Sequence, residues 1–405
     1  MREMKGSGVE WLGEVPAEWG IVPVKRVVVL KHGSDPKTVG DTPVYGSGQS
    51  AFKTCGEFKE GPSVLLGRKG TLNCPQYVEG RFWNVDTAFD VSMRSDDMAL
   101  KYFFYAISSV DIGDLSTNTA KPSMTQGAWY SVKLPLPPLD EQRRIADYLD
   151  EKCAEIDRAV SAAERSIEEY KAYQEAFIKR AITYGVTSSA KTKNSGISAI
   201  GTMNADWRLA MVKRLASFLN GDRSGNYPSG EDIKDAGVPF VTSADLGGRY
   251  LSGSFSKYIS RTKYDSLKGV KLQRGDIVFC LRGSVGKCSM NRTEDCGTVA
   301  SSLAVARPTR CVPEWLNYAL ACSATTGQAI ATAIGATSAN LAANVLEQAL
   351  VPLPPVLEQR CIADYLDEKC AQIDAAIAAK QAIIANLKAY KQSLIYEAVT
   401  GKREV

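Results

Sequence analysis

The chain has 405 residues, 44% hydrophobic and 23% charged, so a packed core divided over two or more domains is expected. No run of about 18 uncharged apolar residues occurs, which predicts that no segment spans a membrane. The opening MREMKGSGVEWLGEVP lacks the apolar stretch of a secretory signal, and a cytoplasmic location is therefore predicted.

Residues 1–133 predict a first mixed α/β domain. Apolar and β-branched runs predict strands, and a longer apolar run predicts a helix at 98–109, with Gly-rich turns between them. The predicted strands are 22–30, 62–67 and 89–93.

Residues 134–190 predict a long helical spacer. Pro137 and Pro138 precede the start, and Asp140 and Glu141 lie in the first turn, where acidic side chains are favoured. Apolar side chains then recur in alternating steps of four and three, the spacing of a coiled-coil seam, and Gly185 is a plausible C-cap. The seam comprises Leu149, Cys153, Ile156, Val160, Ala163, Ile167 and Tyr170.

Residues 191–350 predict a second mixed α/β domain, with strands at 276–280 and 302–306 and a helix at 314–322. Residues 351–405 predict a second helical spacer that ends at Gly401. Lys380 interrupts its seam, and its charged head is expected to reach outward to water. The seam comprises Leu366, Cys370, Ile373, Ile377, Lys380, Ile384 and Leu387.

The two helical segments are copies of one another. Residues 134–183 and 351–400 align without a gap, and more than half of the positions are identical. A second repeat relates 5–27 to 193–215 and includes Trp19 and Trp207. Between these flanks only weak matches remain, such as Arg68 with Arg282. The chain is therefore two halves of one architecture, with similar ends and divergent middles.

The repeat predicts an α+β fold. Each helix of about 40 residues, or about 60 Å, has an apolar stripe that it cannot bury alone. The simplest arrangement pairs the two copies with each other. We therefore expect two mixed α/β domains separated by two long antiparallel helices that form a coiled coil, with pseudo-two-fold internal symmetry.

Catalytic constellations are missing from the sequence. His32 is the single histidine, which excludes two-His metal sites, and none of the ten cysteines forms a CxxC pair. GSVGKC at 283–288 lacks the first glycine and the Ser/Thr of a phosphate loop, and no HExxH or GxSxG occurs. A binding role without catalysis or a bound metal is therefore predicted.

Charge is unevenly distributed. Residues 207–349 hold 17 Lys/Arg against 11 Asp/Glu, a net of +6, and residues 20–133 hold 13 against 11, a net of +2. The helical stretch 140–182 holds 8 against 11, a net of −3. Basic domains joined by an acidic helix are a modest indication of nucleic-acid binding.

Three sequence features resemble the specificity (S) subunits of type I restriction-modification systems, over essentially the whole chain. They are the repeated LPxPPxxEQRxIADYLDEKxAxID block, the W-x4-VKR segments and the PVYGSGQ loop at 43–49. The resemblance implies that each half carries a target recognition domain for one half of a split, asymmetric site in double-stranded DNA. It also implies that the helices set the unspecified spacer and dock the methyltransferase (M) and restriction (R) subunits.

The same resemblance implies a non-catalytic chain without a cofactor of its own. The modification subunits would bind S-adenosylmethionine and methylate adenine at N6. The restriction subunit would bring ATP- and Mg-dependent translocation and cleavage.

Candidate DNA-contacting residues have side chains that suit phosphates or base edges and lie in Gly-rich or basic loops. Arg68 and Arg282 are the foremost candidates, because they occupy matched positions after a predicted strand. In the first domain the candidates are Tyr45, Ser47, Gln49, Arg68, Lys69 and Lys121. In the second they are Thr242, Ser243, Arg282, Ser284, Lys287 and Asn291.

Two alternatives compete with this interpretation. A coiled-coil scaffold that binds only proteins would have the same helices and no sequence-selective DNA binding. A stand-alone methyltransferase would transfer methyl groups by itself, and the missing motifs disfavour it.

Overall fold

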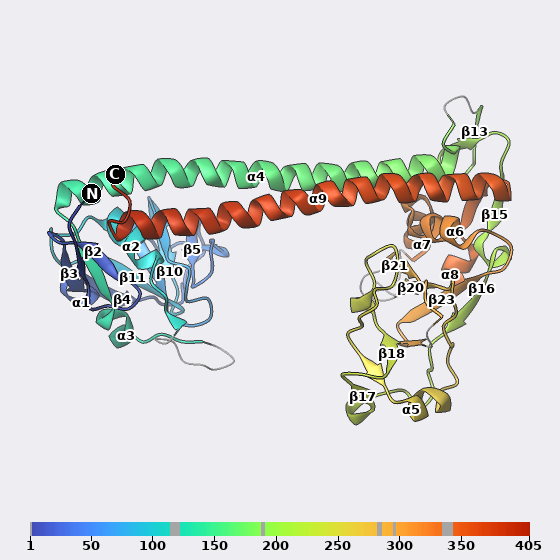
Figure 1. Ribbon diagram of the computed structural model, residues 1–405, viewed down its shortest axis with the longest axis horizontal. Coiled ribbons are helices and arrows are strands. Elements are labelled where there is room, and N and C mark those ends of the chain that lie inside the picture. The colour runs from blue at the N-terminus through green and yellow to red at the C-terminus, as the bar shows by residue number, and fades with distance from the viewer. Residues whose placement is uncertain (1, 114–121, 188–190, 282–285, 295–296, 334–342) are drawn as a thin grey trace. The chain divides into compact units, whose positions relative to one another are not determined.

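The computed structural model describes residues 2–113, 122–187, 191–281, 286–294, 297–333 and 343–405 (Figure 1). The chain forms two compact units: unit 1 contains residues 1–165 and 380–405, and unit 2 contains residues 166–379. The boundary crosses both long helices, because each part of a helix packs on the domain beside it. Among the described helices, none is apolar over a length that could cross a membrane.

The two predicted long helices are present as α4 (Leu139–Tyr184) and α9 (Val356–Val399). Gly185 and Gly401 follow them with φ of +87° and +70°, a conformation that favours glycine, and the predicted C-caps are thereby confirmed.

The helices pair antiparallel within each unit. In unit 1, Lys391 of α9 forms an ion pair of 2.7 Å with Asp157 of α4, and Lys388 lies 3.7 Å from Glu164, further along α4. In unit 2, Gln174 donates a hydrogen bond of 2.9 Å to Asp374. The predicted antiparallel coiled coil is therefore confirmed.

The predicted seam is buried over most of its length. Lys380 is half-buried, as expected for a side chain whose head reaches water. Tyr170 is the exception, because its ring is 36% exposed, and its assignment to the seam was wrong. The buried positions are Leu149, Cys153, Ile156, Val160, Ala163, Ile167, Leu366, Cys370 and Ile373.

Unit 1 contains two four-stranded sheets and two small ones. The helix-side sheet has the order β4-β11-β8-β9, and the outer sheet has the order β6-β5-β10-β7. The small sheets pair β1 with β2 and β3 with β12. The strands are β1 (Met4–Gly6), β2 (Glu14–Pro16), β3 (Gly20–Pro23), β4 (Val28–His32), β5 (Thr42–Tyr45), β6 (Lys53–Cys55), β7 (Lys59–Glu60), β8 (Ser63–Gly67), β9 (Gln76–Val78), β10 (Arg81–Asn84), β11 (Ala88–Met93) and β12 (Lys133–Leu136). The helices are α1 (Val24–Val27), α2 (Leu100–Ser108) and α3 (Gln126–Ser131).

The single strand predicted at 22–30 is wrong. The helical turn α1 divides it, because β3 pairs with β12 whereas β4 pairs with β11 in another sheet. The chain must turn between the two sheets, and the backbone N–H of Val24 bonds to the carbonyl of Val132 at that turn.

Unit 2 repeats this plan. Its helix-side sheet has the order β16-β23-β20-β21, its outer sheet the order β17-β19-β18-β22, and β13-β14 and β15-β24 are the small sheets. The strands are β13 (Thr192–Asn194), β14 (Thr202–Asn204), β15 (Arg208–Met211), β16 (Ala216–Asn220), β17 (Ile233–Lys234), β18 (Val238–Val241), β19 (Tyr258–Ile259), β20 (Ile277–Cys280), β21 (Cys288–Met290), β22 (Thr298–Val299), β23 (Leu303–Pro308) and β24 (Leu350–Leu353). The helices are α5 (Arg261–Ser266), α6 (Pro313–Ala321), α7 (Ser323–Ala333) and α8 (Ala343–Gln348), with 3-10 turns η2 (Val212–Arg214), η3 (Gly230–Asp232) and η4 (Ser243–Asp245).

The units differ at the edge of the outer sheet. In unit 1 the fourth strand β7 pairs with β10, whereas in unit 2 the fourth strand β17 pairs with β19. The inner three strands correspond: β5 pairs antiparallel with β6 and parallel with β10, as β18 does with β19 and β22. The scaffold is therefore repeated and its periphery is not.

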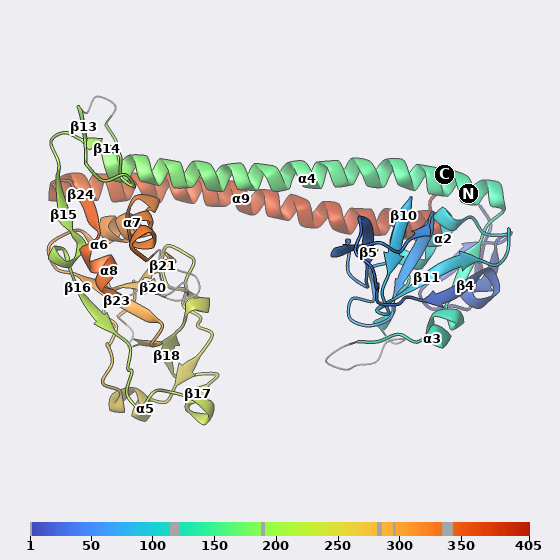
Figure 2. The ribbon, with the colours of Figure 1, turned by 180° about the vertical axis from the view of Figure 1, so that it is seen from behind.

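One helix in each unit fixes the sheets to the long helices: α2 and α6 lie between them (Figures 1 and 2). The Tyr105 hydroxyl donates a hydrogen bond of 2.6 Å to Asp150, and the Tyr318 hydroxyl donates one of 2.8 Å to Asp367. Burial raises the pKa of both tyrosines far above the ordinary value, so the hydroxyls stay protonated and act as donors. Both aspartates belong to the repeated YLDEK sequence.

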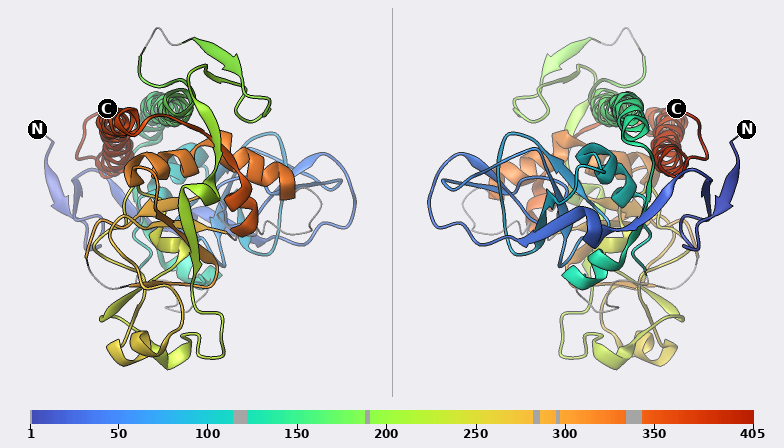
Figure 3. Two further views of the ribbon diagram at one scale, coloured as in Figure 1. Left: turned by 90° about the vertical axis from the view of Figure 1, so that its right-hand side faces the viewer. Right: turned by 90° about the vertical axis from the view of Figure 1, so that its left-hand side faces the viewer.

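The long helices are seen end-on in Figure 3. The same kind of junction joins them to the domain in each unit. The Trp19 indole donates a hydrogen bond of 3.0 Å to Glu141 at the start of α4, and an added Cβ at Gly401, after α9, would lie 3.0 Å from the Trp19 ring. In unit 2 the corresponding residues are Trp207, Glu358 and Gly185.

The glutamines beside these glutamates, Gln142 and Gln359, accept hydrogen bonds from the backbone of the preceding domain, at Ala99 and Val312. The repeated EQ pair therefore joins each domain to its helix.

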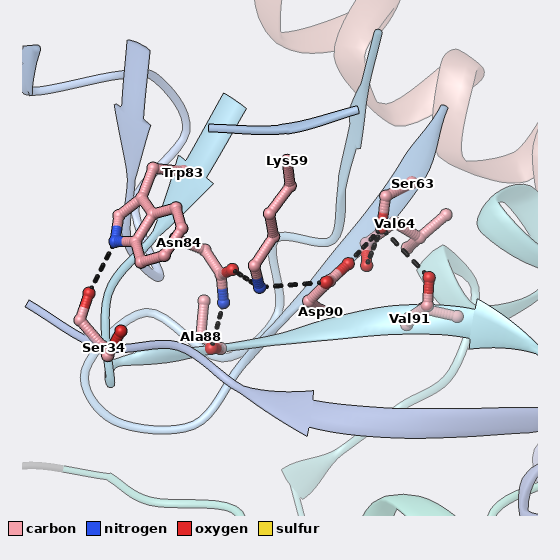
Figure 4. Close-up of polar contacts among 9 residues, drawn as sticks. All are labelled: Ser34, Lys59, Ser63, Val64, Trp83, Asn84, Ala88, Asp90 and Val91. Atoms are coloured by element: carbon pink, nitrogen blue, oxygen red, sulfur yellow. Dashed lines mark hydrogen bonds and ion pairs between the residues drawn. The ribbon is translucent and has the colours of Figure 1, made fainter. Parts of the chain in front are cut away.

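A buried polar network ties the two sheets of unit 1 together (Figure 4). Lys59 of β7 donates hydrogen bonds of 2.6 Å to Asn84 and 3.0 Å to Asp90. Ser63 of β8 donates one of 2.5 Å to the same Asp90. Because every charged group here has a partner, the network fixes how the outer sheet meets the helix-side sheet.

Candidate nucleic-acid interface

The predicted candidates of unit 1 meet at one edge of the domain. Tyr45 ends β5 and the loop 46–49 follows it, the turn at Arg68 and Lys69 follows β8, and the segment 122–124 leads to α3. Ser47 Oγ donates a hydrogen bond of 2.6 Å to the Lys69 carbonyl, and Gly70 N–H donates one of 2.9 Å to the Pro122 carbonyl. The structure therefore brings together residues that are far apart in the sequence.

Glycines allow these loops to approach closely. Gly70 has a φ of +88°, and an added Cβ at Gly46 would lie 2.8 Å from Thr87 Oγ1. Thr87 also accepts a hydrogen bond of 3.3 Å from the backbone N–H of Ser47. The Gly-rich sequence of the loop is thus required by its packing on the β10–β11 connection.

The charge of this edge centres on Asp86. Arg68 donates hydrogen bonds to the Asp86 carboxylate and, at 3.2 Å, to the Asp86 carbonyl. Lys69 Nζ lies 3.6 Å from the same carboxylate, and His32 Nδ1 lies 3.9 Å away. One exposed carboxylate therefore holds two cations, and both keep donors for an anion from solvent.

The remaining candidates of unit 1 differ in their accessibility. Gln49 is exposed, and its amide is suited to base edges. Tyr45 is half-buried and packs on the cluster of Leu65, Val78, Phe82 and Ala88, which leaves it a positioning role. Lys121 lies outside the described residues.

In unit 2, Thr242 and Ser243 follow β18, the counterpart of β5. Thr242 caps η4: its hydroxyl donates a hydrogen bond of 2.9 Å to Asp245 and accepts one of 3.3 Å from the Ala244 N–H. Its side chain therefore shapes the loop, and Ser243 is the half-buried residue beside it.

The β20–β21 connection of unit 2 matches the Arg68 turn of unit 1. Lys287 is exposed there and follows Gly286, whose φ is +95°. Arg282 and Ser284, predicted in the same connection, lie outside the described residues.

Asn291 needs a correction. It is 3% exposed, and its amide donates hydrogen bonds to the carbonyls of Gln273 and Thr293. Because the side chain is buried and its amide is hydrogen-bonded within the turn after β21, Asn291 is not part of the candidate surface.

Sequence reasoning missed Asp86. The antiparallel pairing of Ala88 with Gly67 brings Asp86 beside Arg68. The spacing of these residues along the chain does not predict the contact. His32, the single histidine, is the last residue of β4. It is exposed, and its ring lies 4.9 Å from that of Phe89. Among the described residues, no group of three His, Cys, Asp or Glu is arranged to hold a metal ion.

The fold and these edges define a binding protein with two unlike domains, each mounted on one antiparallel helix pair. The family model for the type I restriction modification DNA specificity domain matches residues 16–162 and 206–389, once in each half. The chain therefore belongs to the type I restriction-modification DNA specificity family, and its role is sequence specificity rather than catalysis. The predicted family is confirmed.

Similar proteins carry the corresponding names. The chain is 22% identical over 380 residues to the type I restriction enzyme EcoBI specificity subunit of Escherichia coli, covering 90% of this chain and 77% of that protein. It is 22% identical over 351 residues to the MjaVIII specificity subunit of Methanocaldococcus jannaschii, covering 84% and 76%. A chain solved in a study of complex assembly and conformational transition of the type I R-M system shares the fold, with a TM-score of 0.69, 18% identity, and coverage of 96% and 99%.

Proposed function

We propose that each unit reads one half of a bipartite, asymmetric DNA site, and that α4 and α9 set the number of unspecified base pairs between the halves. The repeated scaffold with unlike loop edges is the observation that carries this proposal. Two similar scaffolds hold two different surfaces, as recognition of two different half-sites requires.

In unit 1 the reading surface is the edge formed by Ser47, Gln49, Arg68 and Lys69. Arg68 offers a planar donor fork that suits a guanine edge, and Lys69 offers a point charge for a phosphate. In unit 2 the corresponding surface is the loop around Ser243 and the connection that contains Arg282, Ser284 and Lys287. Lys121 adds a cation to the surface of unit 1 in this proposal.

The partners in this proposal are methyltransferase and restriction subunits, docked on the helices. The exposed tyrosines Tyr173 and Tyr390 and the exposed Leu357 lie on the long helices, where a partner can cover them. These subunits would bring S-adenosylmethionine, ATP and Mg, and the chain would bind no cofactor itself. The complex would act on DNA in the cytoplasm.

Methylation mapping tests the proposal. The chain and its methyltransferase partner are produced in cells that lack N6-adenine methylation, and the modified adenines are mapped across the genome. We expect one bipartite motif with a fixed spacer. Methylation without sequence preference, or none, would favour a protein-binding scaffold, and methyl transfer by this chain alone would favour an enzyme.

A further inference from the structure

The cations of unit 2 are concentrated in one segment that carries none of the candidate residues named above. Residues 257–274 hold 6 of the 17 Lys/Arg between 207 and 349 and 1 of the 11 Asp/Glu. The segment contains β19, the helix α5 and most of the chain that leads to β20.

The part of this segment that follows β19 is an addition to the shared scaffold. Between β19 and β20 the connection comprises residues 260–276, whereas between the matching strands β6 and β8 of unit 1 it comprises only residues 56–62. The longer connection holds 5 Lys/Arg against 2 Asp/Glu, a net of +3, and the shorter one holds 1 against 2, a net of −1. The two domains therefore differ in charge at this place.

The described ion pairs neutralise only part of the segment. Arg261 lies 3.2 Å from Asp265, Lys263 lies 3.0 Å from Asp232, and Arg274 lies 3.6 Å from Glu294. Lys257 and Lys268 are exposed and take part in none of these pairs.

The segment adjoins the candidate loop of unit 2. Ser256, which precedes Lys257, donates a backbone hydrogen bond of 2.6 Å to Asp245, and its hydroxyl lies 3.1 Å from that of Thr242. From there β19 runs antiparallel to β18 and carries the chain away from the loop to α5. The basic segment therefore begins beside the loop and extends away from it.

Resting on the proposed function, we propose that Lys257, Arg261 and Lys268 bind the DNA phosphate backbone and anchor unit 2 independently of base sequence. The cations of the segment are mainly lysines, which act as point charges suited to phosphates rather than as base-reading forks. In unit 1 Lys53 occupies the position that matches Lys257. The single cation of its shorter connection 56–62, Lys59, is hydrogen-bonded to Asn84 and Asp90, so the half-site of unit 2 carries more of the salt-dependent affinity.

The test measures affinity against salt for the full chain copurified with its methyltransferase partner. The probes are the methylated motif and a non-target duplex, each of about 40 base pairs. The variant Lys257→Ser/Lys268→Ser is compared with Arg208→Ser/Arg310→Ser, which removes two exposed cations of the same unit outside the segment. Lys257→Arg/Lys268→Arg keeps the charge.

We expect the serine double variant to lower the slope of log affinity against log salt by about 1–2, because each lost phosphate contact removes about 0.9. Affinity falls equally for both probes, so selectivity is kept, and the arginine variant matches the wild type. Adding Arg261→Ser lowers the slope further. An unchanged slope, or an equal loss in the Arg208/Arg310 control, overturns the proposal.

A loss of selectivity without a change of slope also overturns it, since the segment would then read bases. A wild-type complex that fails to prefer the motif refutes the proposed function instead, whatever the slopes of the variants.

Discussion

The Trp19 indole and the Glu141 carboxylate are joined by a hydrogen bond of 3.0 Å across 122 residues of sequence. Trp207 and Glu358 are joined at the same distance in unit 2. Tryptophan and glutamate are each part of a repeated segment, and this bond explains why the two segments recur together. The helix start and the domain entrance are built as one structure.

Removing this acceptor destabilises unit 1. Glu141→Ala leaves the buried Trp19 N–H without a partner and releases the ion pair with Arg2, so the free energy of unfolding is expected to fall by about 1–3 kcal/mol. Urea denaturation followed by tryptophan fluorescence measures the change. The control is Glu151→Ala, an exposed position on the same helix, for which a change within about 0.5 kcal/mol is expected. Equal midpoints for the two variants would contradict the role of this bond.

Arg68 is predicted to read a base. Arg68→Ala is expected to weaken binding of the methylated motif by about 1–3 kcal/mol and to relax the preference at one position of one half-site. Arg282→Ala is expected to do the same in the other half-site. Competition binding at fixed salt measures both variants, and Arg94→Ala, on the same domain outside this edge, is the control. Unchanged affinity would remove the residue from the interface.

Asp86 is predicted to restrain the cations beside it. Asp86→Asn removes the charge that holds Arg68 and Lys69, so affinity for non-target DNA is expected to rise several-fold while selectivity falls. The measurement compares both duplexes at two salt concentrations. If non-target affinity stays constant, the carboxylate is only a structural partner of these side chains.

Helix length is predicted to set the spacer. Seven residues inserted into α4 after Arg165 and seven into α9 before Lys380 preserve the phase of the seam. They lengthen each helix by about 10 Å, close to the rise of about three base pairs. Methylation mapping is expected to show the same two half-sites separated by a longer spacer. A four-residue insertion breaks the seam phase and serves as the contrast. An unchanged spacer in the seven-residue variant would show that helix length does not set the spacer.

Asp222 is predicted to stabilise unit 2 at neutral pH and to make its stability fall in acid. Hydrogen bonds from Ser224 and from the Lys268 N–H lower the pKa of Asp222 to about 2. The usual value is about 3.9, so the folded state favours the carboxylate. This stabilisation is present above about pH 4 and is lost as the pH falls from about 4 toward 2.

Asp222→Asn is therefore expected to lower stability at neutral pH and to flatten its dependence on pH between about 5 and 2. Urea denaturation across that range measures the effect. Asp235→Asn, at an exposed position of the same unit, should retain the wild-type dependence. Parallel curves for wild type and Asp222→Asn would show that the hydrogen bonds do not hold this carboxylate charged.

Local periodicity made the helices predictable. The steps of three and four from Leu149 to Ile167 specify one buried face, and the structure buries it. The glycines after the helices were equally readable, because a left-handed C-cap has a local sequence signature. The predicted strands at 62–67, 89–93, 276–280 and 302–306 also formed, since each is a short apolar run.

Features that depend on pairing between distant strands were not predictable. The break at Val24 arises because β3 and β4 join different sheets. A run of valines does not show where the chain passes from one sheet to the other. Asp86 meets Arg68 through a strand register, and Asn291 is buried by a turn that forms around it. The basic segment around α5 is visible in the sequence, but only the comparison of matching strands shows it to be an addition.

The junctions at the two ends of the helix pair are built from exchanged parts. Each takes its tryptophan and glutamate from one half of the chain and its glycine from the other half. A half-length ancestor could therefore have completed both junctions by pairing with a copy of itself, and it would have read a palindrome. In this chain the two reading surfaces are encoded separately, so a substitution in one of them would change one half-site and leave the other unchanged.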